Sequence, residues 1–116
     1  IQQTEFSLAA KCRGCHLVTY EVLDNLPKPL PKMGILNLFV KHTSCALSIN
    51  ENADPDVRTD MEKILYASPR QEFAIGVSIT IPITNGRLNL GTWQGIYLCE
   101  FRNYGGPRKI VATIYG

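Results

Sequence analysis

Hydrophobic and polar residues alternate most regularly between residues 77 and 84, where every second position is apolar: Val77, Ile79, Ile81 and Ile83. This period of two is typical of a strand with one buried face. Asn85 and Gly86 follow at once, and this pair tolerates the positive φ angles of a tight turn. The pattern therefore predicts a hairpin whose return strand contains Leu88.

A second alternating stretch runs from Ser44 to Asn50. One set of its side chains should face the core and the other should form a small, polar face: Cys45, Leu47 and Ile49 against Ser44, Ala46, Ser48 and Asn50. Further strands are predicted over 2–8, 34–42, 96–102 and 109–115. The stretch 34–42 is apolar on both faces, which predicts a central strand covered on two sides or at a subunit contact.

Two helices are predicted between the strands. Asp54 and Pro55 are a typical N-cap and first helical residue, and an apolar stripe follows them: Val57, Met61, Ile64 and Leu65. Thr19 is expected to cap a shorter helix, which the prolines from Pro27 onward end. About seven strands and two short helices predict an α+β domain in which antiparallel sheets stack as a β-sandwich.

The length, the net charge and the apolar runs of the chain limit its possible domains and partners. A chain of 116 residues predicts one domain over 1–116. A net charge of +2, from 12 basic and 10 acidic residues, is too small to predict binding to nucleic acid or to an anionic membrane. No run of apolar residues is long enough for a membrane span.

Four cysteines are few for a disulfide framework, so we interpret them mainly as thiols of a reducing compartment, the cytoplasm or an organelle interior. A targeting segment is not assessable, because the sequence begins at Ile1 rather than at a methionine. Cys12 and Cys15 have the spacing of a redox or zinc pair. No second pair accompanies them, so a pair placed in a turn is the favoured interpretation.

His42 and Ser44 would lie on one side of an extended chain, and Asp60 lies at the edge of the predicted helical stripe. Their side chains could meet in one pocket, with Asp60 orienting His42. The structural alternative makes His42 a cap at a strand end and turns Ser44 toward a neighbouring backbone. The spacing favours this alternative, since no glycines of a nucleophile elbow surround Ser44.

Polar groups gather where the strand ends and the long helix begins: Asn50, Glu51, Asn52, Asp54 and Asp56. A helix N-terminus can stabilise an anion there, although turns also favour these residue types, so both interpretations stay open. Arg87 could hold a phosphate, and Gln94 beside Trp93 could close a pocket. Glu100 and Arg102 are expected to pair on one strand face.

Two long motifs, HTSCALSINENADPDVRTDMEKIL and SITIPITNGRLNLGTWQGIYLCEFRNYGGPRKIVATI, closely resemble the YjbQ-like family, often labelled secondary thiamin-phosphate synthase. The resemblance implies a β-sandwich subunit that forms a trimer, with sites near subunit boundaries. It also implies a weak activity that joins hydroxymethylpyrimidine diphosphate to a thiazole phosphate. The residues that match the family's signature positions are His42, Ser44, Asn50, Glu51, Asp54, Asp60, Arg87, Trp93, Gln94 and Glu100.

This chain departs from the family between Leu65 and Ser78. Family members carry about two dozen more residues there, with side chains that resemble metal or phosphate ligands. A family segment is therefore expected to be missing between about residues 66 and 76. A divalent metal stays open as a cofactor, because His16 and His42 alone do not define a site.

The predicted function is a thiamin-phosphate synthase-type enzyme that binds phosphorylated small molecules as a homotrimer. The alternative is a non-catalytic trimeric module that binds a metabolite or a metal. In the enzyme, the predicted catalytic residues are His42, Ser44 and Asp60, and the predicted substrate-binding residues are Asn50, Glu51, Asn52, Arg87 and Gln94.

If His42 and Asp60 act as one unit, His42→Ala and Asp60→Asn should each lower synthase activity at least about tenfold, the scale of general acid–base groups. The thermal midpoint should change little, and the double variant should be barely worse than either single variant. Steady-state assays with both thiamin precursors measure this. Two additive losses would instead indicate separate roles.

Overall fold

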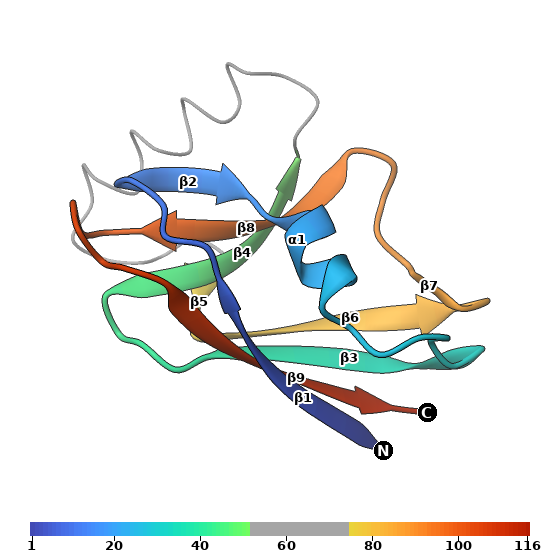
Figure 1. The fold of residues 1–116 in the computed structure, drawn as a ribbon. Helices are drawn as coiled ribbons and strands as arrows, with labels where there is room; N and C mark the ends of the chain where they lie inside the picture. Colours follow the sequence, from blue (N-terminus) through green and yellow to red (C-terminus); the bar gives the residue numbers. More distant parts are fainter. Residues whose placement is uncertain (52–74) are drawn as a thin grey trace.

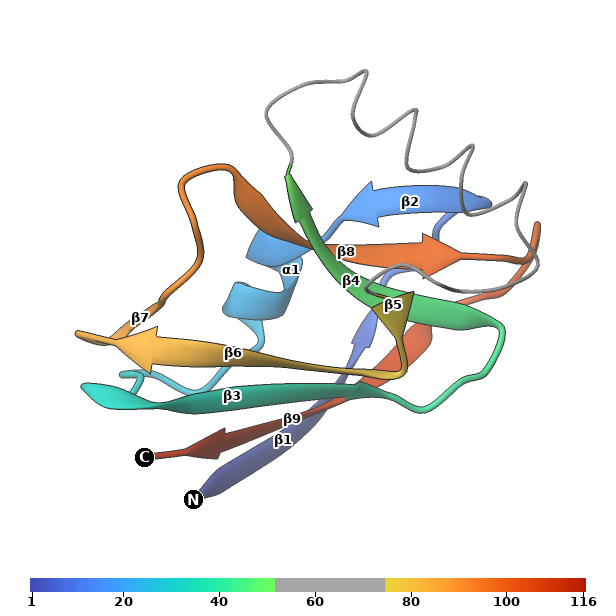
Figure 2. The ribbon, with the colours of Figure 1, turned by 180° about the vertical axis from the view of Figure 1, so that it is seen from behind.

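The computed structural model describes residues 1–51 and 75–116, apart from the side chains of Glu51 and Ile75. In this part of the chain, nine strands form two antiparallel sheets (Figures 1 and 2). The large sheet has the spatial order β1 (Gln2–Leu8), β9 (Arg108–Tyr115), β3 (Met33–Val40), β6 (Ser78–Thr84) and β7 (Arg87–Leu88). The small sheet has the order β2 (Gly14–Leu17), β8 (Gln94–Glu100), β4 (Cys45–Glu51) and β5 (Ile75–Gly76).

One buried apolar cluster, which we call the shared core, joins the inner faces of the two sheets. The large sheet contributes Leu36, Leu38, Ile81, Ile83, Ile110, Ala112 and Ile114, and the small sheet contributes Cys45, Leu47, Ile96 and Leu98. These residues occupy alternate positions of their strands, as the sequence predicts for half-buried sheets. The predicted dominance of antiparallel strands with few helices is therefore confirmed.

The predicted hairpin is also confirmed. Asn85 and Gly86 have positive φ angles of 54° and 73°, and they connect β6 to β7. The hairpin tip rests on the loop that precedes β3, because the Asn85 backbone N–H donates to the carbonyl of Lys32 at 2.6 Å. The tip of the hairpin and this loop are thus held together by main-chain atoms.

The helix α1 (Thr19–Asp24) follows β2 directly. Val22 is fully buried in the shared core and anchors the helix. The prediction that Thr19 caps this helix is wrong: Val18 is the N-cap residue, and no side chain caps the helix there. The hydroxyl of Thr19 instead accepts a hydrogen bond from the Ile96 backbone N–H at 2.9 Å, which ties α1 to β8.

Strand β2 is an element that the sequence did not predict. It has four residues, too few for alternation to be recognised, and it contains Cys15 of the CRGC pair, while Cys12 precedes it. The interpretation of both cysteines as turn residues is therefore wrong for Cys15, which lies in a strand because β8 supplies a hydrogen-bonding edge.

The second face of the small sheet is buried rather than open. Ala46 packs there in a second apolar cluster with Cys15, Tyr97 and Cys99. Ser48 is fully buried on the same face, and its hydroxyl accepts a hydrogen bond from the Asn50 side-chain amide at 3.2 Å. The predicted alternation along β4 is correct: Cys45 and Leu47 lie in the first cluster, and Ala46 lies in the second.

The outer face of the large sheet carries an exposed apolar row. Along β3, Met33, Ile35 and Phe39 are 77%, 45% and 43% exposed, while the alternate residues Leu36, Leu38 and Val40 are buried. Tyr115 lies beside Ile35 in the register of β3 and β9, and it is 48% exposed. The prediction of two apolar faces on this strand is correct, and we call these four residues the outer apolar row.

Several predictions fall outside the described residues. They are the helix that begins near Asp54, with Met61 in its stripe, and the site residues Asn52, Asp56 and Asp60. Within the described chain, no helix is long and apolar enough to span a membrane.

Candidate functional site

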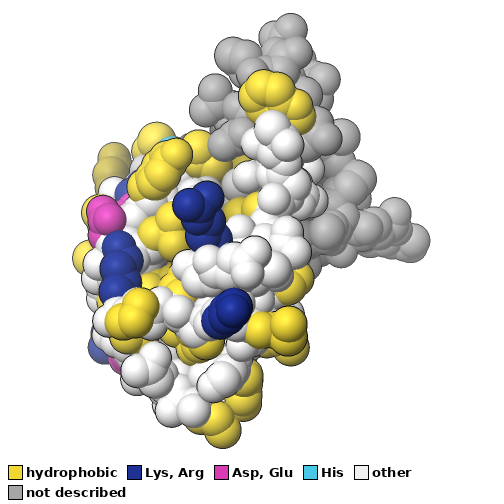
Figure 3. Space-filling view, turned by 90° about the vertical axis from the view of Figure 1, so that its right-hand side faces the viewer, with side chains coloured by type: hydrophobic (Ala, Val, Ile, Leu, Met, Phe, Trp, Pro, Cys, Tyr) yellow, Lys and Arg dark blue, Asp and Glu magenta, His cyan; other side chains and the backbone are white. Residues whose placement is uncertain are grey.

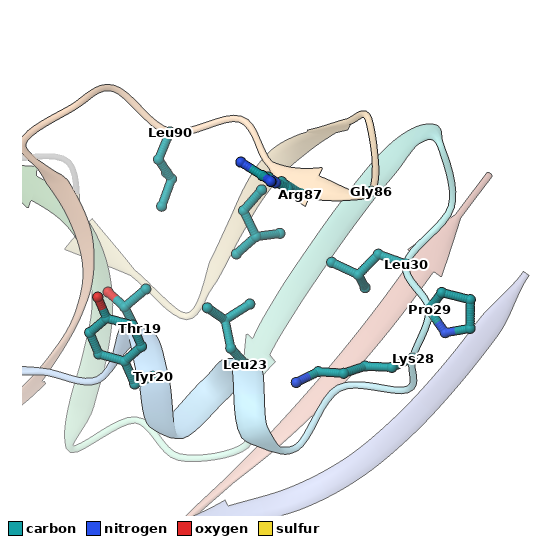
Figure 4. A pocket seen from close by; sticks show the side chains of 10 residues that line it. Thr19, Tyr20, Leu23, Lys28, Pro29, Leu30, Gly86, Arg87 and Leu90 are labelled. Carbon is teal, nitrogen blue, oxygen red and sulfur yellow. The ribbon is translucent and has the colours of Figure 1, made fainter.

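A cleft of about 650 Å³ lies between α1, the loop after it and the β6–β7 hairpin (Figure 4). This volume is in the range of small-molecule sites, which are usually a few hundred to a thousand Å³. The cleft is lined by Thr19, Tyr20, Leu23, Lys28, Pro29, Leu30, Gly86, Arg87, Leu88 and Leu90.

The lining is mainly apolar because leucines from three segments close the cleft toward the protein interior. Leu23 from α1, Leu30 from the following loop, and Leu88 and Leu90 from the hairpin arm are partly buried and pack against the shared core. Tyr20 is 77% exposed and adds an aromatic ring near the cleft's edge. Such a surface can receive a flat, weakly polar ring.

Two cations complete the cleft. Lys28 extends from the loop after α1 and Arg87 from the start of β7, so the two positive groups belong to opposite walls (Figure 4). Within residues 1–51 and 75–116, neither side chain has an ion-pair partner. On this side of the molecule, basic side chains stand among apolar surface (Figure 3).

Arg87 also borders a second hollow of about 470 Å³. Its other lining residues are Thr84, Asn85, Leu88 and Asn89, so it is more polar than the cleft. A guanidinium between an apolar cleft and a polar hollow is suited to an anion, because it can donate two parallel hydrogen bonds to phosphate oxygens. The arrangement combines an apolar wall with cationic groups, which is suited to a ligand that has both an apolar part and a negative charge.

Three of the predicted substrate-binding residues lie at the same end of the molecule as this cleft. In the register of β4 and β8, Asn50 pairs with Gly95 and Glu51 pairs with Gln94. The Gln94 side-chain oxygen accepts a hydrogen bond from the Gly91 N–H at 2.8 Å, which closes the loop that leads back to β7 and Arg87 (Figure 1). Neither Gln94 nor the 58% exposed Trp93 lines the cleft.

His42 and Ser44 lie at the opposite end of β4. An extended strand rises about 3.3 Å per residue, which separates Ser44 from Asn50 by about 20 Å within one subunit. The structure therefore brings Asn50, Glu51 and Gln94 together but not with His42 and Ser44. The expectation that His42 and Ser44 lie on one side of an extended chain is not met, because both belong to the bent segment between the end of β3 at Val40 and the start of β4 at Cys45.

The contacts of His42 and Ser44 are those of loop anchors. Nε2 of His42 accepts a hydrogen bond from the Lys109 backbone N–H at 3.0 Å, so in this arrangement that nitrogen carries no proton. The Ser44 carbonyl accepts from the Phe101 N–H at 3.2 Å and from Nη2 of Arg108 at 3.4 Å. The His42 contact matches the structural alternative, whereas the Ser44 contacts are made by its backbone carbonyl, and a catalytic role for either residue stays a prediction.

A buried ion pair lies at the end of the molecule that contains His42 and Ser44. Glu100 and Arg108 are 0% and 4% exposed, and two parallel hydrogen bonds of 2.8 and 2.5 Å join them. The predicted partner of Glu100 was Arg102, and this is wrong: only the backbone N–H of Arg102 reaches the carboxylate, at 3.2 Å. The loop between β8 and β9 brings Arg108 back to the end of β8.

The pKa values of both members of the pair and of the adjacent Cys45 thiol depart from their ordinary values. Burial by itself would raise the pKa of Glu100, but hydrogen bonds from Arg108 and from backbone N–H groups, with the guanidinium charge, lower it. The hydrogen bonds to Glu100 raise the pKa of Arg108. Burial raises the pKa of the adjacent Cys45 thiol, so this cysteine is suited to packing rather than to nucleophilic chemistry.

The described residues contain no group of three or more His, Cys, Asp or Glu side chains arranged to hold a metal ion. His16 is held in the segment 12–16, where its Nε2 lies 2.6 Å from the Cys12 carbonyl. The described part of the cleft offers two cations and no carboxylate, which is a donor set for an anion rather than for a metal.

Comparison with known proteins defines the family. The model of the UPF0047 protein YjbQ-like family matches residues 4–74 and 67–116, which together cover nearly the whole chain. This chain belongs to the YjbQ-like family. The predicted resemblance is thereby confirmed.

Individual YjbQ-like proteins agree with this assignment. The chain is 42% identical to UPF0047 protein YjbQ of Salmonella typhimurium, over 98% of this chain and 97% of that protein. It is 40% identical to the YjbQ protein of Escherichia coli O157:H7, with the same coverage. A structural-genomics crystal structure from C. acetobutylicum is similar to it with a TM-score of 0.77 and 34% identity, over 99% of this chain and 100% of that one.

The alignment with the Salmonella YjbQ protein spans 134 positions and is longer than the 116 residues of this chain. The two pieces of the family match also overlap at residues 67–74. The names of these relatives carry no activity, so the comparisons identify the family and the fold but no reaction.

The ion pair predicts how stability depends on pH. Because the pKa of Glu100 is lower in the folded protein than in the unfolded chain, the pair's stabilisation is complete above the ordinary carboxyl pKa of about 4.3. It is lost as the pH falls through the folded-state pKa. Glu100→Gln should flatten the acid side of the stability curve and, at pH 7, lower the free energy of unfolding by about 3–5 kcal/mol.

Urea denaturation between pH 3 and 7 measures both effects. The matched control is Glu5→Gln, whose carboxylate pairs with Lys41 at 3.4 Å on the surface. This control should lose less than about 1 kcal/mol. Equal losses in the two variants would contradict the role given to the buried pair.

Proposed function

We propose that this YjbQ-like protein binds a phosphorylated heterocyclic small molecule in the cleft between α1 and the β6–β7 hairpin. The observation that supports this is the placement of Lys28 and Arg87 on opposite walls of an apolar cleft, without ionic partners among the described residues. The ring packs on the leucines and beside Tyr20. The phosphate takes the charge-assisted hydrogen bonds of the two cations.

The reaction that we propose is of the thiamin-phosphate synthase type. The thiazole nitrogen donates its electron pair to the methylene carbon of hydroxymethylpyrimidine diphosphate and forms a C–N bond. The C–O bond to the diphosphate breaks, and the diphosphate leaves with that electron pair. No proton has to move in this step, so cations that stabilise the leaving charge and an apolar wall that limits water are the groups it needs.

The alternative is a non-catalytic module that binds a metabolite and works through its assembly. It is favoured by the absence of His, Asp and Glu among the described lining residues of the cleft, since a pocket without acid–base groups is sufficient for binding. Product formation distinguishes the two proposals. A protein that binds both thiamin precursors, with or without divalent metal, and yields no thiamin phosphate is the module.

Removal of either cation should weaken binding of the pyrimidine diphosphate about ten- to a hundredfold, since a hydrogen bond to a charged group contributes about 1.5–3 kcal/mol. Isothermal titration calorimetry of Lys28→Ala and Arg87→Ala measures this. Arg87→Lys should retain part of the affinity, because it keeps the charge but not the planar fork.

Lys41→Ala is the matched control for these variants. It removes the same charge from the loop at the far end of the molecule, where Lys41 pairs with Glu5, and the affinity should not change. Unchanged affinity in both Lys28→Ala and Arg87→Ala would place the site elsewhere.

We further propose that the outer apolar row, Met33, Ile35, Phe39 and Tyr115, is covered in a homotrimer. Four large side chains, each more than two-fifths exposed on one face of the sheet, form the kind of surface that proteins usually bury against a partner. The polar Asn37 lies between Ile35 and Phe39 on this face, and its side-chain amide donates to the Ser78 hydroxyl of the same subunit at 2.9 Å.

Sedimentation equilibrium at micromolar concentration should therefore give the mass of three subunits. Phe39→Asp should shift the protein to a smaller species, since a buried unpaired charge opposes association. Tyr104→Asp changes an isolated side chain that is 97% exposed and should leave the mass unchanged. A wild-type monomer would refute the assembly.

A further inference from the structure

Cys15 and Cys99 face each other across β2 and β8. They are directly opposed in the strand register, and their sulfur atoms are 3.1 Å apart. Cys15 is 7% exposed and Cys99 is fully buried, and both belong to the second apolar cluster. A disulfide needs sulfur atoms about 2.05 Å apart, so an approach of about 1 Å would bring them to bonding distance.

The hydrogen-bond pattern places this pair at a closely spaced position. The Val18 N–H donates to the Ile96 carbonyl at 2.8 Å, which makes these two residues a hydrogen-bonded pair of the ladder. In antiparallel strands hydrogen-bonded and non-hydrogen-bonded pairs alternate, so Cys15 and Cys99, three steps away, form a non-hydrogen-bonded pair. Side chains are closest at such pairs.

The other neighbour of β8 supports this assignment. The Phe101 N–H donates to the Ser44 carbonyl of the segment that leads into β4, at 3.2 Å. Odd-numbered residues of β8, Cys99 among them, therefore direct their backbone groups toward β4. The backbone of Cys99 is held by one strand while its side chain lies beside the thiol of the other.

We propose that Cys15 and Cys99 form a redox site that closes into a cross-strand disulfide when the protein meets a small-molecule disulfide such as oxidised glutathione. The Cys15 thiolate attacks one sulfur of the oxidant and releases one glutathione, which leaves a mixed disulfide on Cys15. The Cys99 thiolate then attacks the Cys15 sulfur and releases the second glutathione. Both protein thiols are oxidised and one oxidant molecule is reduced to two thiols.

The position of β2 gives the oxidant access to the pair. This strand has four residues and lies at one edge of the small sheet, so opening it breaks the ladder with β8 alone among the described strands. Short edge elements open locally at far lower free energy than the whole domain. Closure of the disulfide would then hold β2, and the start of α1 that follows it, against β8.

Peptide mapping of the wild-type protein tests this directly. The protein is incubated with excess oxidised glutathione, its remaining thiols are alkylated, and it is digested with trypsin without reduction. Arg13 lies between Cys12 and Cys15, so cleavage there separates these two cysteines. The expected product links the peptide of Cys15 to that of Cys99. Absence of this product, or a link from Cys15 to Cys12, would overturn the proposal.

Variants and a stability measurement complete the test. Cys15→Ser and Cys99→Ala should each abolish the linked product, whereas Cys12→Ser and Cys45→Ser should retain it. The oxidised wild type should melt roughly 5–15 °C above the reduced protein, because the link closes a long loop of the unfolded chain. A linked protein that melts at or below the reduced midpoint would show that the bond distorts β2 rather than holding it.

Discussion

The buried pair of Glu100 and Arg108 is the interaction on which one whole end of this protein depends. Removing two charges from water is costly, and the structure compensates with two parallel hydrogen bonds and further donors to the carboxylate. The pair joins the last residue of β8, in the small sheet, to the first residue of β9, in the large sheet. The Ser44 carbonyl receives a further bond from the same guanidinium, so the loop between β3 and β4 is fixed from the same point.

The two ends of β4 differ in whether the polar groups near them already have partners within the described chain. At its start, the ion pair and the His42 contact to Lys109 use the polar groups to hold loops in place. At its end, Asn50 and the loop near Gln94 lead toward the cleft, where Lys28 and Arg87 are without ionic partners in the described chain. Polar groups that are already engaged stabilise the fold, and groups that are not engaged remain for a ligand. This contrast is why the proposed site lies at the second end.

Local patterns in the sequence predicted the elements whose causes are local. The alternation over Val77 to Ile83 and the Asn85–Gly86 turn depend on neighbouring residues, and the structure has both. Local patterns do not predict contacts that a residue makes outside its own element, as Thr19, Glu100 and Lys28 show. The sequence predicts that the hydroxyl of Thr19 caps α1, but this hydroxyl bonds to β8, and Glu100 pairs across a loop rather than along its strand. Lys28 carried no signal, because only the folded chain places it opposite Arg87.

The contact between the hairpin tip and the preceding loop has a consequence for how such a protein can change over time. The two cationic walls are joined by the bond from the Asn85 N–H to the Lys32 carbonyl, and both atoms are main-chain atoms. The distance between the walls is therefore largely independent of the side chains that line them. Replacement of lining residues can alter which molecule is preferred while the opening keeps its size. In evolutionary terms, a frame of this kind lets related proteins diverge in ligand without having to rebuild the cleft.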